Sequence, residues 1–491
     1  MAKKTYFCLI LILVIAAFIR FYRLPEYLQF LGDEGRDVLI VKQMIVDHKF
    51  TLLGPTASVG GFYIGPIYYY FMLPFLWLFR LDPIGPAVMA SLFGLGTIVL
   101  VYYFCKHFVN AKVGLLAAFL ITISPRMIDM SRFSWNPNPM PFFALLTIFL
   151  LYFSVAGKKI LFTFLAGVSV GIMLQLHYID LVFLPIAGLS LMLLFPIRQW
   201  FFQFVSLGLG ILLGNSLFLI FEFRHNFPNI KSVWEFLTRK STPVAPRSLN
   251  FIALFDDVAR QLFDNYLSFA GKISENIYHL SLLGFGIWIA KSVTDKTNRP
   301  KMILLLVWLI VGVLGLGSYR GTLHSHYFGY LYPLPAIMMA VTLSLLLNKK
   351  WLWPVFIVAL IFISYLQIQK WYLWTPPNNL VEQTKNVDKI VLQMVEDQPY
   401  NFALITPGNS DHAYRYFLEL QGSKPIVIEN PQIDPERNTV TNQLIVICEG
   451  PCAPLGNPLW EVAGFGRAEV AQTRQAPVGI TVYKLVHYKG G

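Results

Sequence analysis

Charged residues are scarce in this chain of 491 residues. Asp, Glu, Lys and Arg together make up 13% of it, about half the share found in soluble globular domains. Hydrophobic residues make up 56% and aromatic residues 15%, which leaves too little polar surface for a chain that folds in water. The charge-poor runs recur along most of the length and reach the roughly 17–25 residues that cross a bilayer. The composition therefore predicts a polytopic integral membrane protein.

Cysteine is also rare, with four residues in the chain. Cys8 and Cys105 fall within apolar runs, where they fill space. Cys448 and Cys452 belong to a Cys-Glu-Gly-Pro-Cys segment on the predicted outer side of the membrane, where a disulfide can form. Zinc would need further ligands nearby, and the sequence offers none. A disulfide and a free pair both remain open.

The net charge of +12 does not indicate a nucleic-acid partner, because the basic residues form short clusters between apolar runs and act as topology signals. Lys3 and Lys4 precede an apolar run, Tyr6–Ile19, that lacks a small-x-small cleavage site. We therefore expect an uncleaved first transmembrane helix with a cytoplasmic N-terminus. The predicted inner loops are all basic and contain Lys106, Lys112, Lys158, Lys159, Arg198, Lys291 to Lys301, Lys349 and Lys350.

This charge pattern favours about eleven spans. The Tyr- and Trp-rich run Phe62–Phe79, broken by Pro66 and Pro74, is interpreted as a helix in the outer interface, since a full span there would place the lysines outside. After the first helix, the expected spans cover roughly residues 84–104, 112–124, 139–156, 160–178, 180–196, 200–221, 279–290, 301–317, 327–347 and 351–368.

The chain after about residue 370 has a different residue pattern, without long apolar runs. Strand-like and helix-like segments alternate there, which predicts a small α/β domain over residues 371–491, separate from a transmembrane domain over 1–370. Counting spans places this tail outside the membrane. Helices are expected over 379–398 and 410–420, and strands over 401–406, 425–429, 443–448 and 480–486.

The first outer loop contains an unusual acidic motif, Gly32-Asp33-Glu34-Gly35-Arg36-Asp37. One interpretation is a solvated start of the amphipathic helix that follows, because acidic residues suit a helix N-terminus. The other is a general base or a metal site, for which two adjacent carboxylates near the membrane plane are suitable. The spacing alone leaves both open.

Three further outer segments carry polar side chains. Ser124-Pro125-Arg126 leads through Ser131-Arg132 to Asn136-Pro-Asn138-Pro, which also suits a rigid turn before a helix. His324 and His326 precede a Tyr-rich helix, and His177 lies at another outer turn; each suits a ligand site or an ordinary loop. Arginines on the outer face oppose the positive-inside bias and either bind an anion or reach to lipid headgroups. They are Arg20, Arg23, Arg36, Arg126, Arg132 and Arg320.

The order of these motifs over residues 1–370 resembles the GT-C glycosyltransferases, particularly the protein O-mannosyltransferase and lipid A aminoarabinose transferase type (glycosyltransferase family 39). The resemblance implies an all-α polytopic GT-C-like fold with interfacial helices in the first outer loop. It implies that Asp33 is the catalytic base and Glu34 its neighbour. Asn136 or Asn138 stands where the family commonly has an Asp. If metal binding needs that second carboxylate, this departure argues against metal. A divalent metal is thus possible but not supported, and no cofactor is certain.

The implied activity is transfer of a sugar from a polyprenyl-phosphate donor to an acceptor lipid, glycan or protein, with inversion at the anomeric carbon. The reaction would take place at the outer face of the plasma (inner) membrane. By the same resemblance, residues of the outer loops bind the donor phosphate or sugar. These are Arg36, Arg132, Arg320, His324, His326, Asn136, Asn138 and His177.

Two other classes of protein fit part of the pattern. A carrier or flippase for an anionic lipid-linked glycan accounts for the spans and the arginines, but such proteins place their charges at mid-bilayer, and the expected spans are almost free of acids. A receptor whose tail binds a ligand leaves the acidic motif unexplained.

Overall fold

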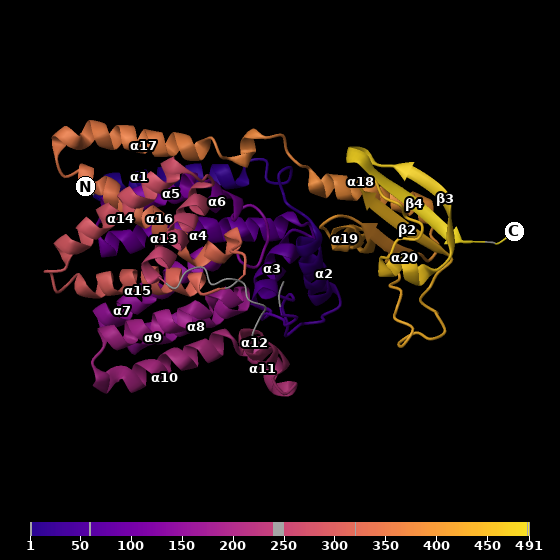
Figure 1. Cartoon of the computed structure of the whole chain (residues 1–491), viewed down its shortest axis with the longest axis horizontal. Helices are drawn as coiled ribbons and strands as arrows, with labels where there is room; N and C mark the ends of the chain where they lie inside the picture. Colours follow the sequence, from indigo (N-terminus) through magenta and orange to yellow (C-terminus); the bar gives the residue numbers. More distant parts are fainter. Residues whose placement is uncertain (1, 58–59, 239–249, 320, 489, 491) are drawn as a thin grey trace. The chain divides into compact units, whose positions relative to one another are not determined.

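The computed structural model describes residues 2–57, 60–238, 250–319, 321–488 and 490. The chain divides into two compact units (Figure 1). Unit 1 comprises Met1–Tyr22, Phe50–Phe75 and Gly85–Thr375, and unit 2 comprises Arg23–Lys49, Leu76–Ile84 and Pro376–Gly491. Unit 2 thus joins two segments of the first outer loop to the C-terminal tail, a grouping that the predicted boundary near residue 370 did not include.

Unit 1 is a bundle of helices (Figure 1). Its α-helices are α1 (Ala2–Phe21), α3 (Ile67–Leu78, which ends in unit 2), α4 (Ile84–Phe108), α5 (Ala111–Ile123), α6 (Pro125–Asp129), α7 (Met140–Gly157), α8 (Ile160–Leu176), α9 (Phe183–Leu194), α10 (Ile197–Gly214), α11 (Ser216–Arg224), α12 (Pro228–Thr238), α13 (Phe251–Leu267), α14 (Lys272–Ser292), α15 (Arg299–Gly317), α16 (Pro333–Leu346) and α17 (Trp353–Ile368). Its short 3-10 helices are η1 (Tyr178–Val182), η2 (Ser325–Leu331), η3 (Lys350–Leu352) and η4 (Tyr372–Trp374).

The apolar helices confirm a multi-pass membrane protein. Within the described residues, six helices are long and apolar enough to cross a membrane, and the number rises to seven if η2 and α16, a pair bent by 55°, are counted as one span. Four shorter apolar segments accompany them. Each of the expected span ranges overlaps a helix of unit 1. The number of helices that cross the bilayer stays a prediction.

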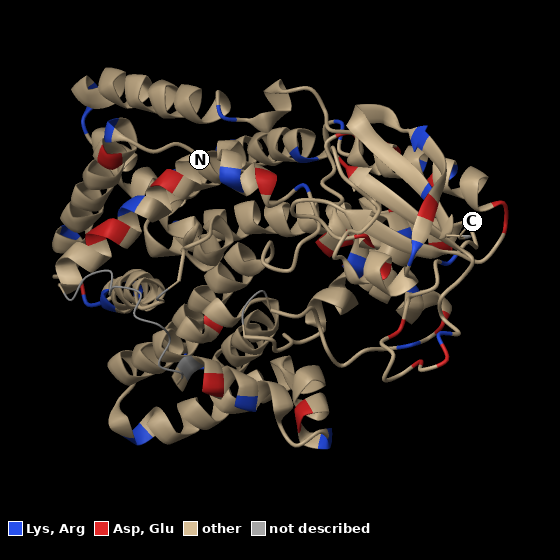
Figure 2. Ribbon diagram, turned by 45° about the vertical axis from the view of Figure 1, so that its right-hand side comes forward, with Lys and Arg blue, Asp and Glu red and all other residues tan. Residues whose placement is uncertain are grey.

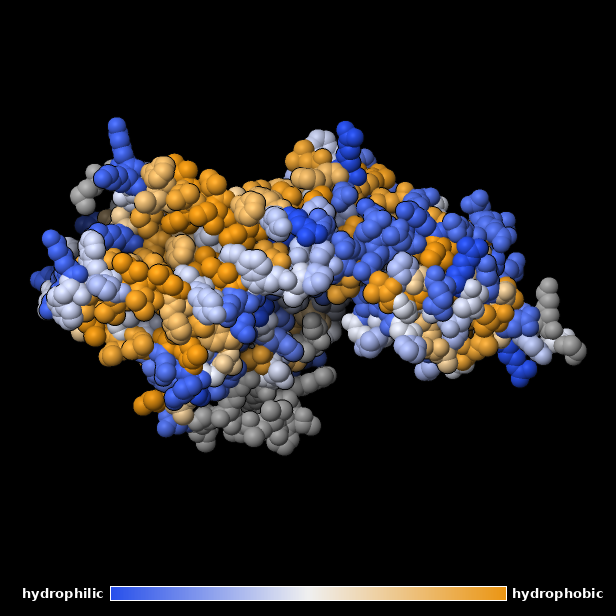
Figure 3. Space-filling model, turned by 90° about the horizontal axis from the view of Figure 1, so that it is seen from above, coloured by the Kyte–Doolittle hydropathy of each residue, from blue (hydrophilic) through white to orange (hydrophobic). Residues whose placement is uncertain are grey.

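The surface of unit 1 matches this assignment. Charged residues are sparse along its long helices (Figure 2), and apolar side chains cover much of the face shown in Figure 3. Exposed apolar side chains form continuous stripes on α1 and α17, where they would contact lipid. On α17 the stripe consists of Val355, Ile357, Val358, Ile361 and Phe362.

Paired glycines bring two helices of unit 1 into close contact. Gly167 and Gly171 of α8 face Gly210 and Gly214 of α10, so each helix presents a Gly-x3-Gly pattern to the other. A Cβ on Gly210 would overlap the carbonyl oxygen of Phe164. Small residues at this spacing let membrane helices approach to backbone contact. The glycines therefore set the α8–α10 interface.

Unit 2 is a small α/β domain with a mixed four-stranded sheet (Figure 1). Its elements are α2 (Gly32–Val46), α18 (Leu380–Val395), β1 (Asn401–Ile405), α19 (His412–Leu420), β2 (Gln443–Glu449), α20 (Trp460–Phe465), β3 (Ala468–Gln475), η5 (Pro477–Gly479) and β4 (Ile480–His487). The strand order is β1-β2-β4-β3; β1 and β2 are parallel, and the other neighbours are antiparallel.

Both faces of this sheet are covered. On β2, Ile445 and Ile447 pack under α18 and α19, whereas Leu444 and Val446 pack on the other face, with α20. Strand residues point alternately to the two faces, so a run of consecutive apolar residues marks a strand buried on both sides. The structure also bridges Cys448 at the end of β2 to Cys452.

The tail confirms most of the elements expected from sequence and corrects two. β1, β2, β4, α18 and α19 lie where they were expected. The predicted strand over 425–429 is wrong, because that segment pairs with the sheet only at Ile426, opposite Asn401. β3 was missed, since it is a mostly exposed, polar strand at the sheet edge, without the apolar alternation that reveals a strand.

Candidate active site

The acidic motif forms the first turn of α2 in unit 2. The helix begins at Gly32, so it includes the motif rather than following it, and Asp33 and Glu34 lie near its N-terminus. Leu31 occupies the N-cap and offers no side-chain hydrogen bond. Free N–H groups and the helix dipole at this end favour negative charge. The motif is therefore a helix start, as one interpretation expected, but it is not solvated throughout, because Glu34 and Asp37 are buried. A helix start is compatible with a catalytic role for one of the acids.

Arg36 orders two of the carboxylates. Its Nη1 lies 2.9 Å from Asp33 Oδ1, and its Nη2 lies 2.8 Å from Asp37 Oδ1. The two acids differ in access, since the side chain of Asp33 is 55% exposed and that of Asp37 is 1% exposed. Asp33 is thus the carboxylate of this group that a substrate can reach. The contacts of Arg36 here are with acids, and its predicted contact with the donor stays a prediction.

Glu34 has the opposite environment. Its side chain is buried, and its oxygens accept hydrogen bonds from the backbone N–H of Leu31 at 3.0 Å and from Gln29 Nε2 at 3.3 Å. Burial raises the pKa of Glu34 from 4.5 to about 7, because desolvation disfavours the charged form. Glu34 therefore supports the helix start and does not face solvent as Asp33 does.

Three histidines gather in unit 1 with two aromatic residues. The ring centroid of His326 lies 4.6 Å from that of Trp135, 5.5 Å from that of His177 and 5.7 Å from that of His324. Tyr327 contacts all three histidine rings. The structure thus brings His177 to His324 and His326, which lie far from it in the sequence. Imidazole N–H groups beside aromatic faces suit a sugar or a phosphate.

Arg126 extends this cluster. Its charge acts on His326 and on Tyr332, and its Nη1 lies 3.2 Å from Asp129 Oδ2. Its Nε is buried and has no hydrogen-bond partner within the described part of the chain. The sequence marked Arg126 only as one of several outer arginines. What distinguishes Arg126 is an Nε that has no hydrogen-bond partner among the described residues. This feature depends on tertiary packing and therefore cannot be seen in the sequence.

Arg132 has a different set of contacts. Its Nε donates to the hydroxyl of Tyr372 at 2.6 Å, Nη1 to the carbonyls of Ile19 and Arg20 at 2.5 and 2.8 Å, and Nη2 to the carbonyl of Tyr22 at 2.7 Å. These carbonyls belong to the C-terminal turn of α1 and its exit, where a cation is favourable. In this structure Arg132 anchors the end of α1, and its predicted contact with the donor rests on the resemblance alone.

Asn136 and Asn138 hold local backbone. Asn136 Nδ2 donates to the carbonyl of Leu176 at 2.6 Å, at the end of α8, and Asn138 Nδ2 donates to the carbonyl of Phe133 at 2.8 Å. Both side chains are buried. These contacts match the rigid-turn interpretation, and sugar binding by these amides stays a prediction. The predicted site residue Arg320 lies outside the described residues.

Among the described residues, no three His, Cys, Asp or Glu side chains are grouped as a metal ion requires. In the acidic motif, Asp33 and Asp37 form ion pairs with Arg36.

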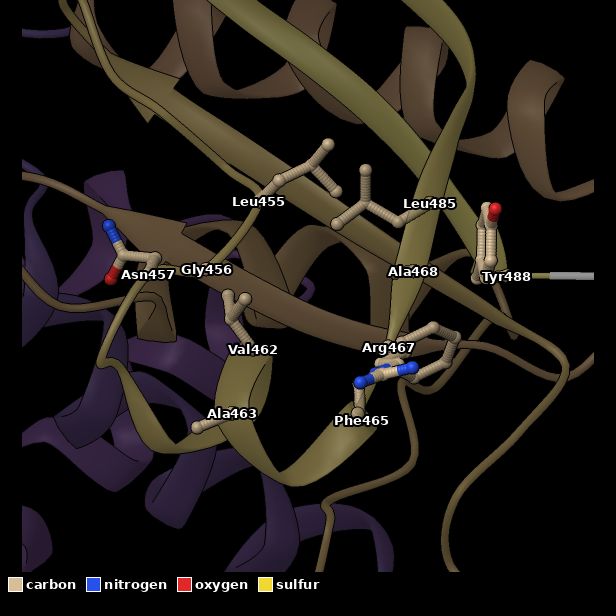
Figure 4. A pocket seen from close by; sticks show the side chains of 11 residues that line it. Leu455, Gly456, Asn457, Val462, Ala463, Phe465, Arg467, Ala468, Leu485 and Tyr488 are labelled. Atoms are coloured by element: carbon tan, nitrogen blue, oxygen red, sulfur yellow. The ribbon is translucent and has the colours of Figure 1, made fainter. Parts of the chain in front are cut away.

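Two hollows lie away from these groups. An apolar groove of about 820 Å³ in unit 1 runs along α17 beside Phe119 of α5 and ends at Lys370 and Trp374. A cavity of about 540 Å³ in unit 2 is lined by Val462, Phe465, Arg467 and other residues around α20 (Figure 4). It lies on the α20 face of the sheet, whereas α2 packs against α19 on the other side. The cavity is thus not part of the acidic site.

A bundle of apolar helices, an acidic motif after the first of them and a small α/β tail define a class of fold, that of the GT-C membrane glycosyltransferases. The model of the family described as dolichyl-phosphate-mannose-protein mannosyltransferase matches residues 64–221. The resemblance found in the sequence is therefore confirmed.

Two solved structures of membrane glycosyltransferases are similar to this chain. The chain is similar to ArnT from Cupriavidus metallidurans bound to undecaprenyl phosphate, with a TM-score of 0.65 over 97% of each chain at 13% identity. It is also similar to the archaeal oligosaccharyltransferase AglB from Archaeoglobus fulgidus, in complex with an inhibitory peptide and a dolichol-phosphate. That match has a TM-score of 0.51 and covers 90% of this chain and 69% of AglB at 13% identity. No curated protein sequence matches the chain.

Proposed function

We propose that this protein is a glycosyltransferase that moves a sugar from a polyprenyl-phosphate donor to an acceptor lipid, glycan or protein at the outer membrane face. The observation that carries the proposal is Asp33, an exposed carboxylate that Arg36 holds at the N-terminus of α2, in a chain with the fold of GT-C glycosyltransferases. ArnT and AglB were solved with undecaprenyl phosphate and dolichol-phosphate, which are polyprenyl phosphates.

Asp33 is the general base in this proposal. Its carboxylate accepts the proton from the hydroxyl or amine of the acceptor as that atom forms a bond to the anomeric carbon. The bond between the anomeric carbon and the phosphate oxygen breaks, and polyprenyl phosphate leaves as an anion. Direct displacement inverts the anomeric configuration and needs no covalent enzyme intermediate. Glu34 supports α2 rather than touching the substrate.

Unit 1 supplies donor recognition. Arg126, with its unpartnered Nε, and the three histidines offer N–H donors to the phosphate and the sugar, and charge-assisted bonds of this kind stabilise a departing anion. The apolar groove along α17 suits the isoprenoid chain. Arg36, Arg132, Arg320, Asn136 and Asn138 remain proposed donor contacts on the strength of the resemblance.

The proposed function requires a particular orientation of the protein in the membrane. The basic loops support an N-terminus in the cytoplasm and a tail outside the plasma (inner) membrane. Residues 1–370 then form the transmembrane domain and 371–491 an extracytoplasmic domain. The reaction as written requires no metal.

The test is transfer by the purified protein from a panel of labelled polyprenyl-phosphate sugars to candidate acceptors. We expect one donor to yield a glycosylated product with inverted anomeric configuration. Movement of an intact lipid-linked glycan across proteoliposomes, without transfer from any donor, would support the carrier instead and reject this function.

A further inference from the structure

The glycines of the acidic motif are contact points with the C-terminal domain. A Cβ on Gly32 would overlap Ser410, and a Cβ on Gly35 would overlap the backbone N of Ala413. Gly32 and Gly35 are three residues apart and therefore share one face of α2. This face lies against the start of α19 (Figure 1). The Gly-Asp-Glu-Gly pattern is thus explained by close packing on the tail, with Asp33 left accessible between the two contacts.

Asn409 supplies the cap that α2 lacks. The N-cap residue Leu31 has no polar side chain, and Asn409 Oδ1 instead accepts a hydrogen bond from the N–H of Gly32 at 2.9 Å. Asn is among the preferred capping residues. Here it acts across 377 positions of the chain, and it fixes the residue that directly precedes Asp33.

Glu449 holds this cap in place. Asn409 Nδ2 donates to Glu449 Oε1 at 3.1 Å, and the same carboxylate accepts from Thr406 Oγ1 at 2.7 Å and from the Tyr414 hydroxyl at 2.8 Å. Glu449 ends β2, a buried strand next to the Cys448–Cys452 bridge. Asn409 is therefore attached to the rigid sheet and not to a free loop.

A second contact fixes the other end of α2. Lys42 Nζ lies 2.6 Å from Glu419 Oε2 of α19, and the two side chains are only 13% and 12% exposed. An ion pair so shielded from water is screened less by salt than a surface pair. Helix α2 is thus held at its first turn by Asn409 and near its last turn by Lys42.

From these contacts we infer that Asn409 is a positioning residue for Asp33. The C-terminal domain thus contributes to catalysis by holding the helix turn that carries Asp33. The inference rests on the proposed function for the role of Asp33. The tail fixes the first turn of α2, so the direction of the Asp33 carboxylate depends on Asn409. His412, whose Nδ1 lies 2.7 Å from Ser410 Oγ, adjoins the same turn and senses the charges of Asp33, Arg36, Asp411 and Arg415.

The test compares Asn409→Ala, Asn409→Asp, Glu449→Gln and the double variant Asn409→Asp/Glu449→Gln in the full-length protein. Loss of the cap in Asn409→Ala should lower kcat about tenfold while donor binding is unchanged. Asn409→Asp places two carboxylates side by side and should be at least as impaired. In the double variant the Gln amide donates to the new carboxylate, so kcat should recover. A defect that does not arise from the hydrogen bond between positions 409 and 449 would not be rescued by this exchange.

Backbone amide exchange over residues 31–37 provides a readout independent of transfer. Exchange should rise in Asn409→Ala and return in the double variant, whereas unchanged exchange in Asn409→Ala would overturn the inference. Faster exchange with normal kcat would also overturn it, because the cap would then not serve Asp33. If the wild type transfers no sugar, the proposed function fails, and the exchange result still decides whether Asn409 holds α2.

Two glycine variants give a matched control in the same unit. Gly35→Ala forces a Cβ into the backbone of Ala413 and should abolish transfer, whereas Gly408→Ala, next to Asn409, meets nothing within 4 Å and should be neutral. Equal activity of the two variants would contradict the role of the α2–α19 contact.

Discussion

Asp33 and Glu34 are adjacent in the chain but have opposite surroundings. Asp33 is half exposed and paired with Arg36, whereas Glu34 is buried and bonded to the helix start. The division follows from the helix, in which neighbouring residues point about 100° apart. One acid can therefore meet a substrate while the other maintains the backbone that presents it.

The buried position of Glu34 predicts a pH-dependent stability. Its pKa is about 7 in the folded protein and 4.5 as its ordinary value, so the folded state binds the proton more tightly. The contribution of Glu34 to stability should be greatest below pH 4.5, fall as pH rises toward 7 and remain low above it. Glu34→Gln removes this effect, worth at most ~3 kcal/mol. The Tm of Glu34→Gln minus that of the wild type should increase from pH 5 to pH 8. An identical difference at both pH values would refute the assignment.

Substitution of Arg132 and of Arg126 should have different effects on stability and on donor binding. Arg132→Ala loses four hydrogen bonds around the end of α1 and should lower the Tm. Arg126→Ala should leave the Tm nearly unchanged and weaken donor binding by about 1.5–3 kcal/mol, the scale of a hydrogen bond to a charged group. Thermal unfolding and binding of a labelled polyprenyl phosphate measure the two effects. Normal donor affinity in Arg126→Ala would remove it from the site.

Sequence alone could propose Asp33 as the base, because the acidic motif and the segments after it follow the order of the family it resembles. It could not identify Asn409 or the contacts of Arg132, since these depend on residues hundreds of positions away. A signal for Asn409 was nonetheless present. The glycines at positions 32 and 35 of a helix start indicate that another backbone approaches closely, although not which one.

At the scale of elements, the α8–α10 pair depends on backbone contact. Gly210 touches the backbone of α8, while Gly208 of the same helix meets nothing within 4 Å. Gly210→Ala should therefore lower the Tm of the protein in detergent by several degrees, and Gly208→Ala should keep or raise it because Ala favours helix. A smaller loss in Gly210→Ala than in Gly208→Ala would show that the helices do not pack in this way.

The elements also show which parts of a fold a sequence reveals. Apolar runs marked the long helices, which face lipid or one another, and the strands β1 and β2, which are buried on both faces. β4 was marked by β-branched and aromatic residues, although it is only partly buried. The edge strand β3 carries mostly polar residues and gave no such signal. The union of residues 23–49 and 76–84 with the tail was equally hidden, because it arises from contacts between distant segments.

At the scale of the whole molecule, the orientation in the membrane can be measured. The tail is proposed to be extracytoplasmic, so a cysteine at the exposed position Gln432 should react with a membrane-impermeant thiol reagent in intact cells. Lys159→Cys, in a predicted inner loop, should react only after the membrane is disrupted. Both variants need a Cys8→Ser background, because Cys8 is exposed and the remaining cysteines are buried or bridged. The reverse labelling pattern would place the tail inside.

The most direct measurement is sugar transfer by Asp33→Asn beside the wild type. Asp33 lies inside α2 and is not its N-cap, its ion pair with Arg36 is half exposed and therefore contributes little to stability, and Arg36 keeps its pair with Asp37. The Tm and donor binding should therefore change little. Loss of a general base typically costs about 10²–10⁴ in rate. We therefore expect kcat to fall at least about a hundredfold with donor affinity intact. Near-normal transfer by Asp33→Asn would contradict the catalytic assignment.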